Sequence, residues 1–408
     1  MINVNRLKER MLQMAEIGKT TNDGVTRLAL SNEDKQARDL FMQWMENLGL
    51  HVRYDDFGNI YGRLEGNDSD APPLMIGSHL DSVPKGGRFD GVLGVLGALE
   101  VVESILENNI QNERPIEIVS FTNEEGARFT PQMLGSGAVT NLFSKDYTYS
   151  RTDKDGFILK EELQKIGYLG SQDNRLDQEN VAAFIEMHIE QGPVLETNHK
   201  TVGIVEGIAG FSWMEVVISG EANHSGTTPM ELRRDSLVTA SSAIKAIHEW
   251  ARSKKDGTVA TVGEINTEPG IMNAIPGTTS FTLDVRHPYK DGFTSCINEI
   301  RESIEDIVDE DSLTCNINEI KTHPPVTFAE NITSTLEEAS KKHDIPYHRM
   351  TSGAGHDAMY MNTIADTAMV FVPSISGKSH CEEENTHWED IEKGVTVLYE
   401  SVLRKSRE

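Results

Sequence analysis

The sequence predicts an α/β protein with two domains, and three observations support this prediction. Several short apolar segments have the character of strands that lead directly into polar residues, as in open α/β sheets. A glycine-rich apolar segment between two of them has the character of a crossover helix. In the middle of the chain the pattern changes to strand, helix, strand, strand, helix, strand, which is the ferredoxin-like order. The 408 residues suffice for two to three domains of about 150 residues each.

The first part of the chain supplies a surface helix and two strands. Apolar residues three to four positions apart after Asn32 indicate an amphipathic helix that ends at Gly49. Residues 51–54 and 60–64 then have strand character on either side of a turn, Asp56-Phe57-Gly58-Asn59. These elements precede the segments that carry the candidate metal-binding residues.

Four later segments share one design, a short apolar strand followed by residues that can bind a metal ion. They are Pro73–His79, Pro115–Glu124, Val181–His188 and Thr367–Pro373, the last leading to His380. Because reactive groups collect at the carboxyl ends of strands in open α/β sheets, we expect one crevice to gather all four ends. The crossover helix is expected at Gly91–Glu107, with close packing allowed by Gly94 and Gly97. Residues 146–179 are polar and helical in pattern, which indicates an excursion over the surface.

Residues 211–325 are predicted to form an inserted α+β domain of the ferredoxin-like (βαββαβ) type. Its strands are expected at 211–219, 259–265, 278–285 and 312–321, and its helices at 234–251 and 293–308. Pro324-Pro325 marks the return to the larger domain, whose last helices are expected at 329–343 and 390–405. The larger domain therefore comprises residues 1–210 and 326–408, with a mixed, largely parallel sheet flanked by helices, and Gly207–Gly210 is expected to act as a hinge.

Charge and cysteine content favour a cytoplasmic protein that binds a small molecule. Lys and Arg total 38 against 65 Asp and Glu, a formal net charge of −27, and such a field repels nucleic acids and anionic lipid. With neither a basic patch nor an apolar run of about 20 residues, no nucleic-acid or membrane partner is expected. The three cysteines, Cys296, Cys315 and Cys381, lack the spacing of a disulfide framework or a thiolate zinc site. No secretion signal is visible at the start.

The first candidate residues lie in Gly77-Ser-His79-Leu-Asp81 and Gly86-Gly-Arg-Phe-Asp90-Gly91. A histidine at a strand end can offer a ring nitrogen to a metal ion, and Asp81 can hold that imidazole or a neighbouring group in place. Asp90 lies where a helix begins, so it either caps the helix or presents a bridging carboxylate.

The next candidates are Glu124, Glu125, His188 and His380. The two glutamates are placed at a strand end, where adjacent side chains point to opposite sides, so one can bind a metal ion while the other faces a different wall. Each residue alone is more often structural or solvated. Together, however, nitrogen and carboxylate donors suit paired zinc, manganese, cobalt or nickel ions. Two ions that share a carboxylate, with a glutamate as proton carrier, are suited to hydrolysis of an amide-type bond.

This constellation resembles the dinuclear metallopeptidase and amidase superfamily that includes carboxypeptidase G2 and aminoacylase-1. Further motifs are similar to its subgroup of N-carbamoyl-L-amino acid hydrolases, β-ureidopropionases and allantoate amidohydrolases. They are Gly86-Gly-Arg-Phe-Asp90-Gly91, Met187-His188-Ile-Glu-Gln191-Gly-Pro193, Asn223-His224-Ser-Gly-Thr-Thr-Pro229 and Ser352-Gly-Ala-Gly355-His356-Asp357-Ala358. The resemblance covers nearly the whole chain. It also implies that peptidase relatives commonly carry a carboxylate at the position of His188.

The resemblance implies two divalent ions per subunit, zinc or manganese, with cobalt or nickel as alternatives. The implied ligands are His79, Asp90, Glu125, His188 and His380. Asp90 bridges the two ions, Glu124 is the general base that moves a proton from water to the leaving nitrogen, and Asp81 supports the site from behind. The residues alone do not fix which ligands share which ion.

The resemblance also assigns substrate contacts and assembly. The implied substrate-binding residues are Gln191, His224, Asn273, Arg286, Gly353 and Gly355. His224 would donate to the oxyanion, although by itself it is equally a turn histidine. Arg286 would clamp a substrate carboxylate with two parallel hydrogen bonds. The inserted domain would act as a lid and form the contact of a homodimer. Arg233-Arg234-Asp235 is interpreted as a solvated helix start.

The function expected from these residues is hydrolysis of the ureido group of an N-carbamoyl-L-amino acid to amino acid, ammonia and carbon dioxide. Allantoate amidohydrolase or β-ureidopropionase activity is the alternative. Aminoacylase or dipeptidase activity is disfavoured by His188 and Gln191. A metal-binding or regulatory protein without catalysis would have no use for Glu124, and Cys381 is disfavoured as a ligand or nucleophile because the metal set is complete without it.

Overall fold

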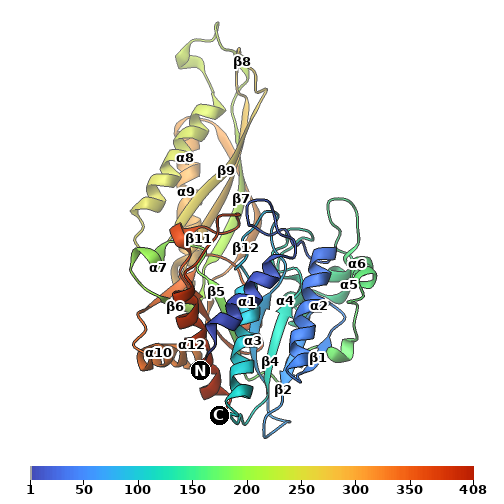
Figure 1. Ribbon diagram of the computed structural model, residues 1–408. Helices are drawn as coiled ribbons and strands as arrows, with labels where there is room; N and C mark the ends of the chain where they lie inside the picture. Colours follow the sequence, from blue (N-terminus) through green and yellow to red (C-terminus); the bar gives the residue numbers. More distant parts are fainter. Residues whose placement is uncertain (1) are drawn as a thin grey trace. The chain divides into compact units, whose positions relative to one another are not determined.

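The computed structural model (Figure 1) describes residues 2–408, which form two compact units. Each unit has its own hydrophobic core. Unit 1 comprises the chain up to Glu206 together with Phe328–Met350 and Ala354–Glu408. Unit 2 comprises Gly207–Thr327 and Thr351–Gly353. Among the described residues, no helix is both long and apolar enough to cross a membrane.

Four parallel strands form the centre of the sheet in unit 1. In spatial order they are β4 (Ile116–Phe121), β3 (Leu74–His79), β5 (Ala183–Ile189) and β15 (Asp366–Val372). Apart from Asp366 their residues are buried, as expected of strands covered on both faces. Because the four strands run in the same direction, their carboxyl ends meet at one edge of the sheet.

Antiparallel strands extend this centre on both sides, so the sheet is mixed, as the sequence predicts. β1 (His51–Tyr54) and β2 (Ile60–Leu64) continue from β4. Beyond β15 lies β6 (Val202–Ile208), which pairs with β15 and with β14 (Tyr347–Ser352). The end of β6 that belongs to unit 2 pairs with β13 (Val326–Thr327), which lies in that unit.

Helices cover both faces of the sheet. α3 (Val92–Glu107) contacts β3 and β5, and α12 (Trp388–Lys405) contacts β15. On the other face α11 (Asp357–Met361) contacts β5, where Glu186 accepts a hydrogen bond from the Ala358 backbone N–H at 2.9 Å. The remaining helices of unit 1 are α1 (Val4–Ala15), α2 (Asn32–Asn47), α4 (Leu134–Val139), α5 (Lys145–Tyr149), α6 (Leu159–Ile166), η1 (Gln172–Asn174), α7 (Val194–Thr197), α10 (Glu330–Lys342) and η3 (Ile375–Gly377).

The packing of α3 corrects one prediction. A Cβ at Gly94 would lie 2.3 Å from the Met187 carbonyl oxygen and 2.7 Å from the Ser78 Cβ, so the helix backbone approaches the sheet closely there. At Gly97 the nearest atom, the Met187 Sδ, would be at an ordinary contact distance of 3.4 Å. Close approach therefore requires glycine at the first position only.

Unit 2 has the ferredoxin-like order of elements expected from the sequence. Its elements are β7 (Gly210–Ser219), α8 (Ser236–Ser253), β9 (Val259–Glu268), β11 (Thr278–His287), α9 (Lys290–Glu310) and β12 (Thr314–His323). The strands pair antiparallel in the order β12-β7-β11-β9, and α8 and α9 pack on each other and on the sheet. The sequence did not predict a short ribbon of β8 (Asn223–His224) and β10 (Ala274–Ile275), or the turn of helix η2 (Met230–Leu232).

Candidate active site

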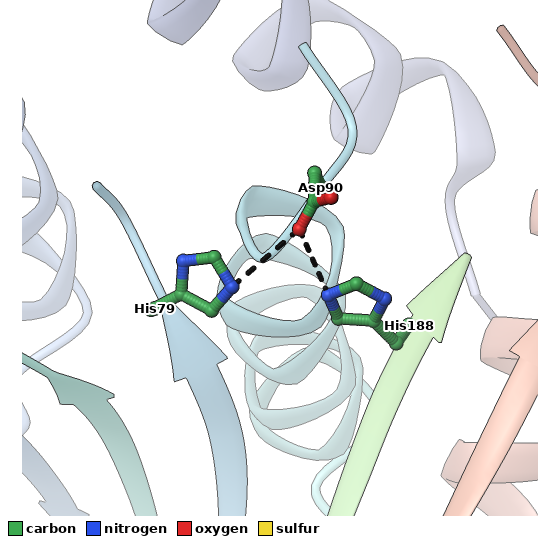
Figure 2. A group of neighbouring side chains, drawn as sticks. All are labelled: His79, Asp90 and His188. Atoms are coloured by element: carbon green, nitrogen blue, oxygen red, sulfur yellow. Dashed lines mark ion pairs between the residues drawn. The ribbon is translucent and has the colours of Figure 1, made fainter. Parts of the chain in front are cut away.

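Three buried side chains meet at the carboxyl edge of the sheet in unit 1. His79 is the last residue of β3, His188 lies near the end of β5, and Asp90 lies just before α3. Figure 2 shows the Asp90 carboxylate between the two rings, with one oxygen, Oδ1, 3.5 Å from the His79 Nε2 and 3.1 Å from the His188 Nε2. Gly91 makes room for this arrangement, since a Cβ there would lie 2.3–2.5 Å from atoms of the His79 ring.

A second group shares Asp90. Its other oxygen, Oδ2, lies 3.4 Å from the His380 Nε2, which is also 3.3 Å from the Glu125 Oε2. The side chain of His380 is 51% exposed, whereas those of Asp90 and Glu125 are each 4% exposed. The five residues thus divide into two groups of possible metal ligands joined by one carboxylate, a division that the sequence left open.

The donor atoms in both groups fit a divalent cation. The Nδ1 atoms of His79 and His188 each lie 2.9 Å from a backbone carbonyl, which can only accept, so each Nδ1 carries the proton. Each Nε2 therefore remains as the ring nitrogen that can bind a metal ion once it is deprotonated, as metal-binding histidines require, and the His188 Nε2 also lies 3.1 Å from the Gly91 backbone N–H. Two ligand atoms bound about 2.0–2.1 Å from a tetrahedral ion lie about 3.4 Å apart, close to the separations of 3.1–3.5 Å found here.

The electrostatics of the site also favour a cation. Burial alone lowers the pKa of His79, but Glu124, Asp90 and Asp81 raise it well above its usual value. A hydrogen bond with Asp90 is the main cause that raises the pKa of His380 to about 9. Burial and the charge of Asp90 raise the pKa of Glu125 to about 8. Protons thus balance the concentrated negative charge, and a bound cation would replace them.

The two glutamates diverge for a reason other than the one predicted. β4 ends at Phe121, so strand alternation does not reach Glu124 and Glu125, and a bend with Asn123 at φ +57° separates their directions instead. Asp81 accepts hydrogen bonds from the backbone N–H groups of both glutamates, at 3.2 and 3.3 Å. One carboxylate therefore fixes the backbone that carries the candidate base and a candidate ligand.

Glu124 belongs to neither group of possible ligands but lies beside them. Its Oε2 is 3.5 Å from the His79 Nε2, and its side chain is 9% exposed. Burial is the main cause that raises its pKa well above the usual value. A buried carboxyl group with a raised pKa is suited to accepting and returning a proton.

Gln191, predicted to contact substrate, also holds the candidate bridging carboxylate. Its Nε2 donates to the Asp90 Oδ2 at 2.7 Å and lies 3.3 Å from the Ser379 Oγ. Because a carboxylate can only accept, the Gln191 amide must direct its nitrogen, and not its oxygen, toward Asp90. The Gln191 Oε1 is buried and has no hydrogen-bond partner among the described residues, so it is a free acceptor. Gly355 lies in the same unit, where a Cβ would be 2.9 Å from the Gln132 Nε2.

The other predicted substrate contacts lie in unit 2 and form two pairs. His224 and Asn273 come together on the β8–β10 ribbon, where the Ser225 N–H donates to the Asn273 carbonyl at 3.1 Å. The His224 Nδ1 accepts from the Gly226 N–H at 3.0 Å, so the neutral ring carries its proton on Nε2. In the second pair, Arg286 donates to the Gly353 carbonyl at 2.6 Å. The structure thus shows the Gly353 carbonyl as an acceptor for Arg286.

Arg286 and Arg233 both have additional roles in unit 2. The Arg286 guanidinium also forms an ion pair with Asp284 at 2.8 Å, which orients it. Arg233, interpreted from the sequence as part of a solvated helix start, donates to the carbonyls of Ser225 at 2.7 Å and Thr228 at 3.2 Å. It therefore braces the turn that carries His224.

Sequence reasoning missed several buried residues that support the ligands. Glu384 accepts from the backbone N–H groups of Phe89 and Asp90, but the run Glu382–Glu384 resembles solvated acids and gives no signal. His356 packs edge-on against the His188 ring, with centroids 4.6 Å apart. Asp357 accepts from Ser136, while its Oδ2 is buried without a hydrogen-bond partner among the described residues. His356 and Asp357 both lie in the motif Ser352–Ala358, which the sequence analysis did identify.

Comparisons with known proteins find similar chains along nearly the whole length of this one. The sequence profile of peptidase family M20/M25/M40 matches residues 75–404. An N-carbamoyl-L-amino-acid amidohydrolase of Pseudomonas sp. is 41% identical over 99% of this chain and 98% of its own length. An allantoate amidohydrolase of Escherichia coli is 32% identical over 96% of this chain and 95% of its own length. A crystal structure of an amidase of the hydantoinase/carbamoylase family from Burkholderia multivorans has a TM-score of 0.95 at 40% identity, covering 100% of this chain and 98% of that one.

Proposed function

This chain belongs to peptidase family M20/M25/M40, and from that premise we propose that it is a metal-dependent N-carbamoyl-L-amino-acid amidohydrolase. The observation that carries the proposal is the pair of donor groups joined by Asp90, with Glu124 beside them. Relatives between 36% and 41% identical that are named for this activity support the choice of substrate.

Two divalent ions, zinc or manganese with cobalt or nickel as alternatives, are the proposed cofactors. His79, Asp90 and His188 would hold one ion, and Asp90, Glu125 and His380 the other. When bound, such ions polarise a carbonyl group and lower the pKa of water. Asp81 keeps Glu124 and Glu125 in place through their backbone N–H groups.

Glu124 is the proposed general base. It would take a proton from the water that attacks the ureido carbon and return it to the leaving nitrogen, so that the carbon–nitrogen bond breaks. Cleavage of this bond would give the amino acid and carbamate, and the carbamate would then decompose to ammonia and carbon dioxide. The free Gln191 Oε1 is an acceptor suited to a ureido N–H group.

Unit 2 is proposed to supply the remaining substrate contacts. The Nε2–H of His224 would donate to the oxyanion, and the Asn273 amide would bind the ureido group. Arg286 would bind the substrate carboxylate, with Gly353 and Gly355 completing the pocket. Replacing Arg286 by Lys should then raise KM more than it lowers kcat, because a lysine cannot form two parallel hydrogen bonds.

Allantoate hydrolysis is the second candidate. The relative from Escherichia coli that is named for this activity aligns with nearly the whole chain. An allantoate amidohydrolase could use the same ligands and the same base, so the donor groups do not separate the two substrates. β-Ureidopropionase activity is a third possibility within the subgroup, while His188 and Gln191 disfavour an aminoacylase or dipeptidase.

A homodimer formed through unit 2 is the proposed assembly, and unit 2 would act as a lid. β9 is an edge strand of its sheet, and it exposes apolar side chains, with Val259 at 54% and Ile265 at 45%. Exposed edges of this kind pair with other chains unless they are covered. The proposed compartment is the cytoplasm, supported by three cysteines that are unpaired in the structure.

The experiment that tests the function measures ammonia release by manganese-reconstituted protein. The substrates are N-carbamoyl-L-methionine, N-carbamoyl-β-alanine and allantoate, with amino-acid release from a dipeptide measured in parallel and a chelator-treated control. Chelator-sensitive ammonia release from N-carbamoyl-L-methionine in preference to the others supports the proposal. Preference for allantoate would replace it with the second candidate, and cleavage of the dipeptide alone would assign the chain to the peptidases.

A further inference from the structure

We propose that Glu384 is a positioning residue that joins the two loops of the metal centre, setting the direction of the Asp90 carboxylate and holding the segment that carries His380. The inference rests on the proposed function in so far as the donor groups bind metal ions. It concerns the affinity for those ions and not the substrate, so it can be tested without any substrate.

The contacts of Glu384 join two separate parts of the chain. Its Oε1 accepts from the backbone N–H groups of Phe89 at 3.0 Å and Asp90 at 3.1 Å. Its Oε2 accepts from the Ser379 Oγ at 2.9 Å. Ser379 precedes His380, and Asp90 lies 294 positions earlier than Glu384. The Glu384 carboxylate therefore connects Asp90, which belongs to both donor groups, with the loop that carries the exposed His380.

The sequence around Asp90 leaves space for this carboxylate. A Cβ at Gly87 would lie 1.9 Å from the Glu384 Oε1 and 2.0 Å from its Cδ, a distance that real side chains do not show. The backbone φ of Gly87 is outside the left-handed region, so backbone conformation does not demand glycine there. The approach of Glu384 gives a physical reason for glycine at this position.

Ser379 adds a second connection to the same carboxylates. Its Oγ lies 3.0 Å from the Asp90 Oδ2 and 2.9 Å from the Glu384 Oε2. The hydroxyl has a single hydrogen, so it donates to one of the two at a time. Asp90 is thereby held at its backbone by Glu384 and at its Oδ2 by Gln191, while Ser379 donates either to the Asp90 Oδ2 or to the Glu384 Oε2.

Loss of such a partner weakens metal binding. Partners that orient metal ligands are typically worth about 10–100-fold in metal affinity. Without Glu384, the backbone at Asp90 and the loop of His380 are each free to shift. The group of Asp90, Glu125 and His380 depends on both loops, so it should lose the most affinity.

The test is a cobalt(II) titration of chelator-treated protein, followed by visible absorption, for the wild type and Glu384→Ala. We expect two binding phases in the wild type and a weaker second phase in the variant, with the dissociation constant raised about 10–100-fold. Turnover of the variant should recover when the metal concentration is raised to saturation. The unfolding temperature of the metal-free variant, measured alongside, reports any loss of fold.

Two further variants control the experiment. Glu383→Ala is the matched control, because Glu383 is 70% exposed and pairs only with Lys378 among the described residues, and it should bind cobalt like the wild type. Gly87→Ala places a Cβ where the Glu384 carboxylate lies, so it should displace that carboxylate without removing it. The double variant Gly87→Ala/Glu384→Ala should then bind cobalt no more weakly than Glu384→Ala alone. The reason is that both changes remove the same contact, the one between the Glu384 carboxylate and the backbone before α3.

The outcomes separate the inference from its premise. Unchanged cobalt affinity in Glu384→Ala overturns the positioning role, whether or not any substrate is hydrolysed. Weaker affinity that is fully additive with Gly87→Ala overturns it as well, because the two changes would then act independently. Absence of cobalt binding in the wild type would instead contradict the proposed metal centre. If Glu384→Ala fails to fold, Gly87→Ala provides the comparison, because its Cβ displaces the Glu384 carboxylate without removing it.

Discussion

At the scale of single residues, the role of each histidine depends on which of its two ring nitrogens makes a hydrogen bond to the backbone. His79 and His188 use Nδ1 to donate to backbone carbonyls and so present Nε2 to Asp90. His224 uses Nδ1 to accept and so presents an N–H group. The same side chain is thus prepared for metal binding in one place and for hydrogen-bond donation in another, and the neighbouring backbone makes the difference.

Replacing Glu124 by Gln separates binding from catalysis. The amide cannot take up a proton, so turnover should fall by about 10²–10⁴-fold, the usual contribution of a general base. Glu124 lies outside both groups of possible ligands, so metal content should stay unchanged. Metal analysis and steady-state kinetics on the same preparation provide the measurement. Full activity in this variant would remove Glu124 from the mechanism.

Replacing His188 by Asp tests a ligand. The shorter carboxylate cannot reach the position of the imidazole Nε2, which lies 3.1 Å from the Asp90 Oδ1. Metal content and turnover should therefore decrease together, and added metal should restore both only in part. Metal analysis after dialysis, combined with an activity assay, measures this. Unchanged turnover would contradict the assignment of His188.

At the scale of elements, the close approach of α3 to the sheet determines where the ligands end up. α3 begins directly after Asp90 and Gly91, so its depth against β3 and β5 sets the distance from Asp90 to His79 and His188. Gly94 is the position at which the helix backbone lies on the carbonyl of Met187. Packing of the helix and geometry of the site are therefore coupled.

Gly94→Ala and Gly97→Ala form a matched pair that measures this coupling. The first change inserts a methyl group 2.3 Å from a backbone oxygen and should destabilise the protein by about 1–3 kcal/mol. In Gly97→Ala the new Cβ would lie no closer than 3.4 Å to any neighbouring atom, so it causes no clash. Because alanine favours a helix more than glycine does, this change should leave the free energy of unfolding unchanged or raise it by up to about 1 kcal/mol. Urea unfolding of both variants gives the comparison. Equal effects would show that the helix does not approach the sheet as described.

At the scale of the whole molecule, the chain has a net charge of −27 and buries several acids, Asp81, Asp90, Glu124 and Glu384, around the candidate metal centre. Metal ions that bind only the folded state stabilise it by linkage, by about 2.7 kcal/mol when free metal is 100 times Kd. We therefore expect chelation to lower the unfolding temperature, and added manganese to raise it in a concentration-dependent manner. Differential scanning calorimetry measures both changes, and an unfolding temperature independent of metal would contradict a structural contribution of the ions.

Metal affinity should also depend on pH with a definite sign. In the metal-free site the raised pKa values of His380, about 9, and Glu125, about 8, mean that both groups hold protons at neutral pH. Metal binding must release these protons, so affinity should increase as pH rises and level off above about pH 9. Isothermal titration calorimetry at several pH values and in buffers of different ionisation enthalpy measures the protons released. No proton release at pH 7 would contradict the assignment.

The sequence by itself determined the fold class, the order of the six main elements of unit 2, and the placement of His79 and His188 at the ends of neighbouring strands in unit 1. It could do so because hydrophobic periodicity is local, and because parallel strands place their ends together whatever their details. The resemblance of the motifs added the family, which the comparisons confirm.

Only the tertiary structure decided how the candidate ligands divide and what holds them. The division into two groups sharing Asp90 depends on distances between strands that are far apart in the chain. The bend at Asn123, the bracing role of Arg233 and the burial of Glu384 have no periodic signature, because each arises from contacts with distant backbone groups. Burial is what distinguishes Glu384 from the exposed Glu383 beside it, and burial is a property of the folded chain.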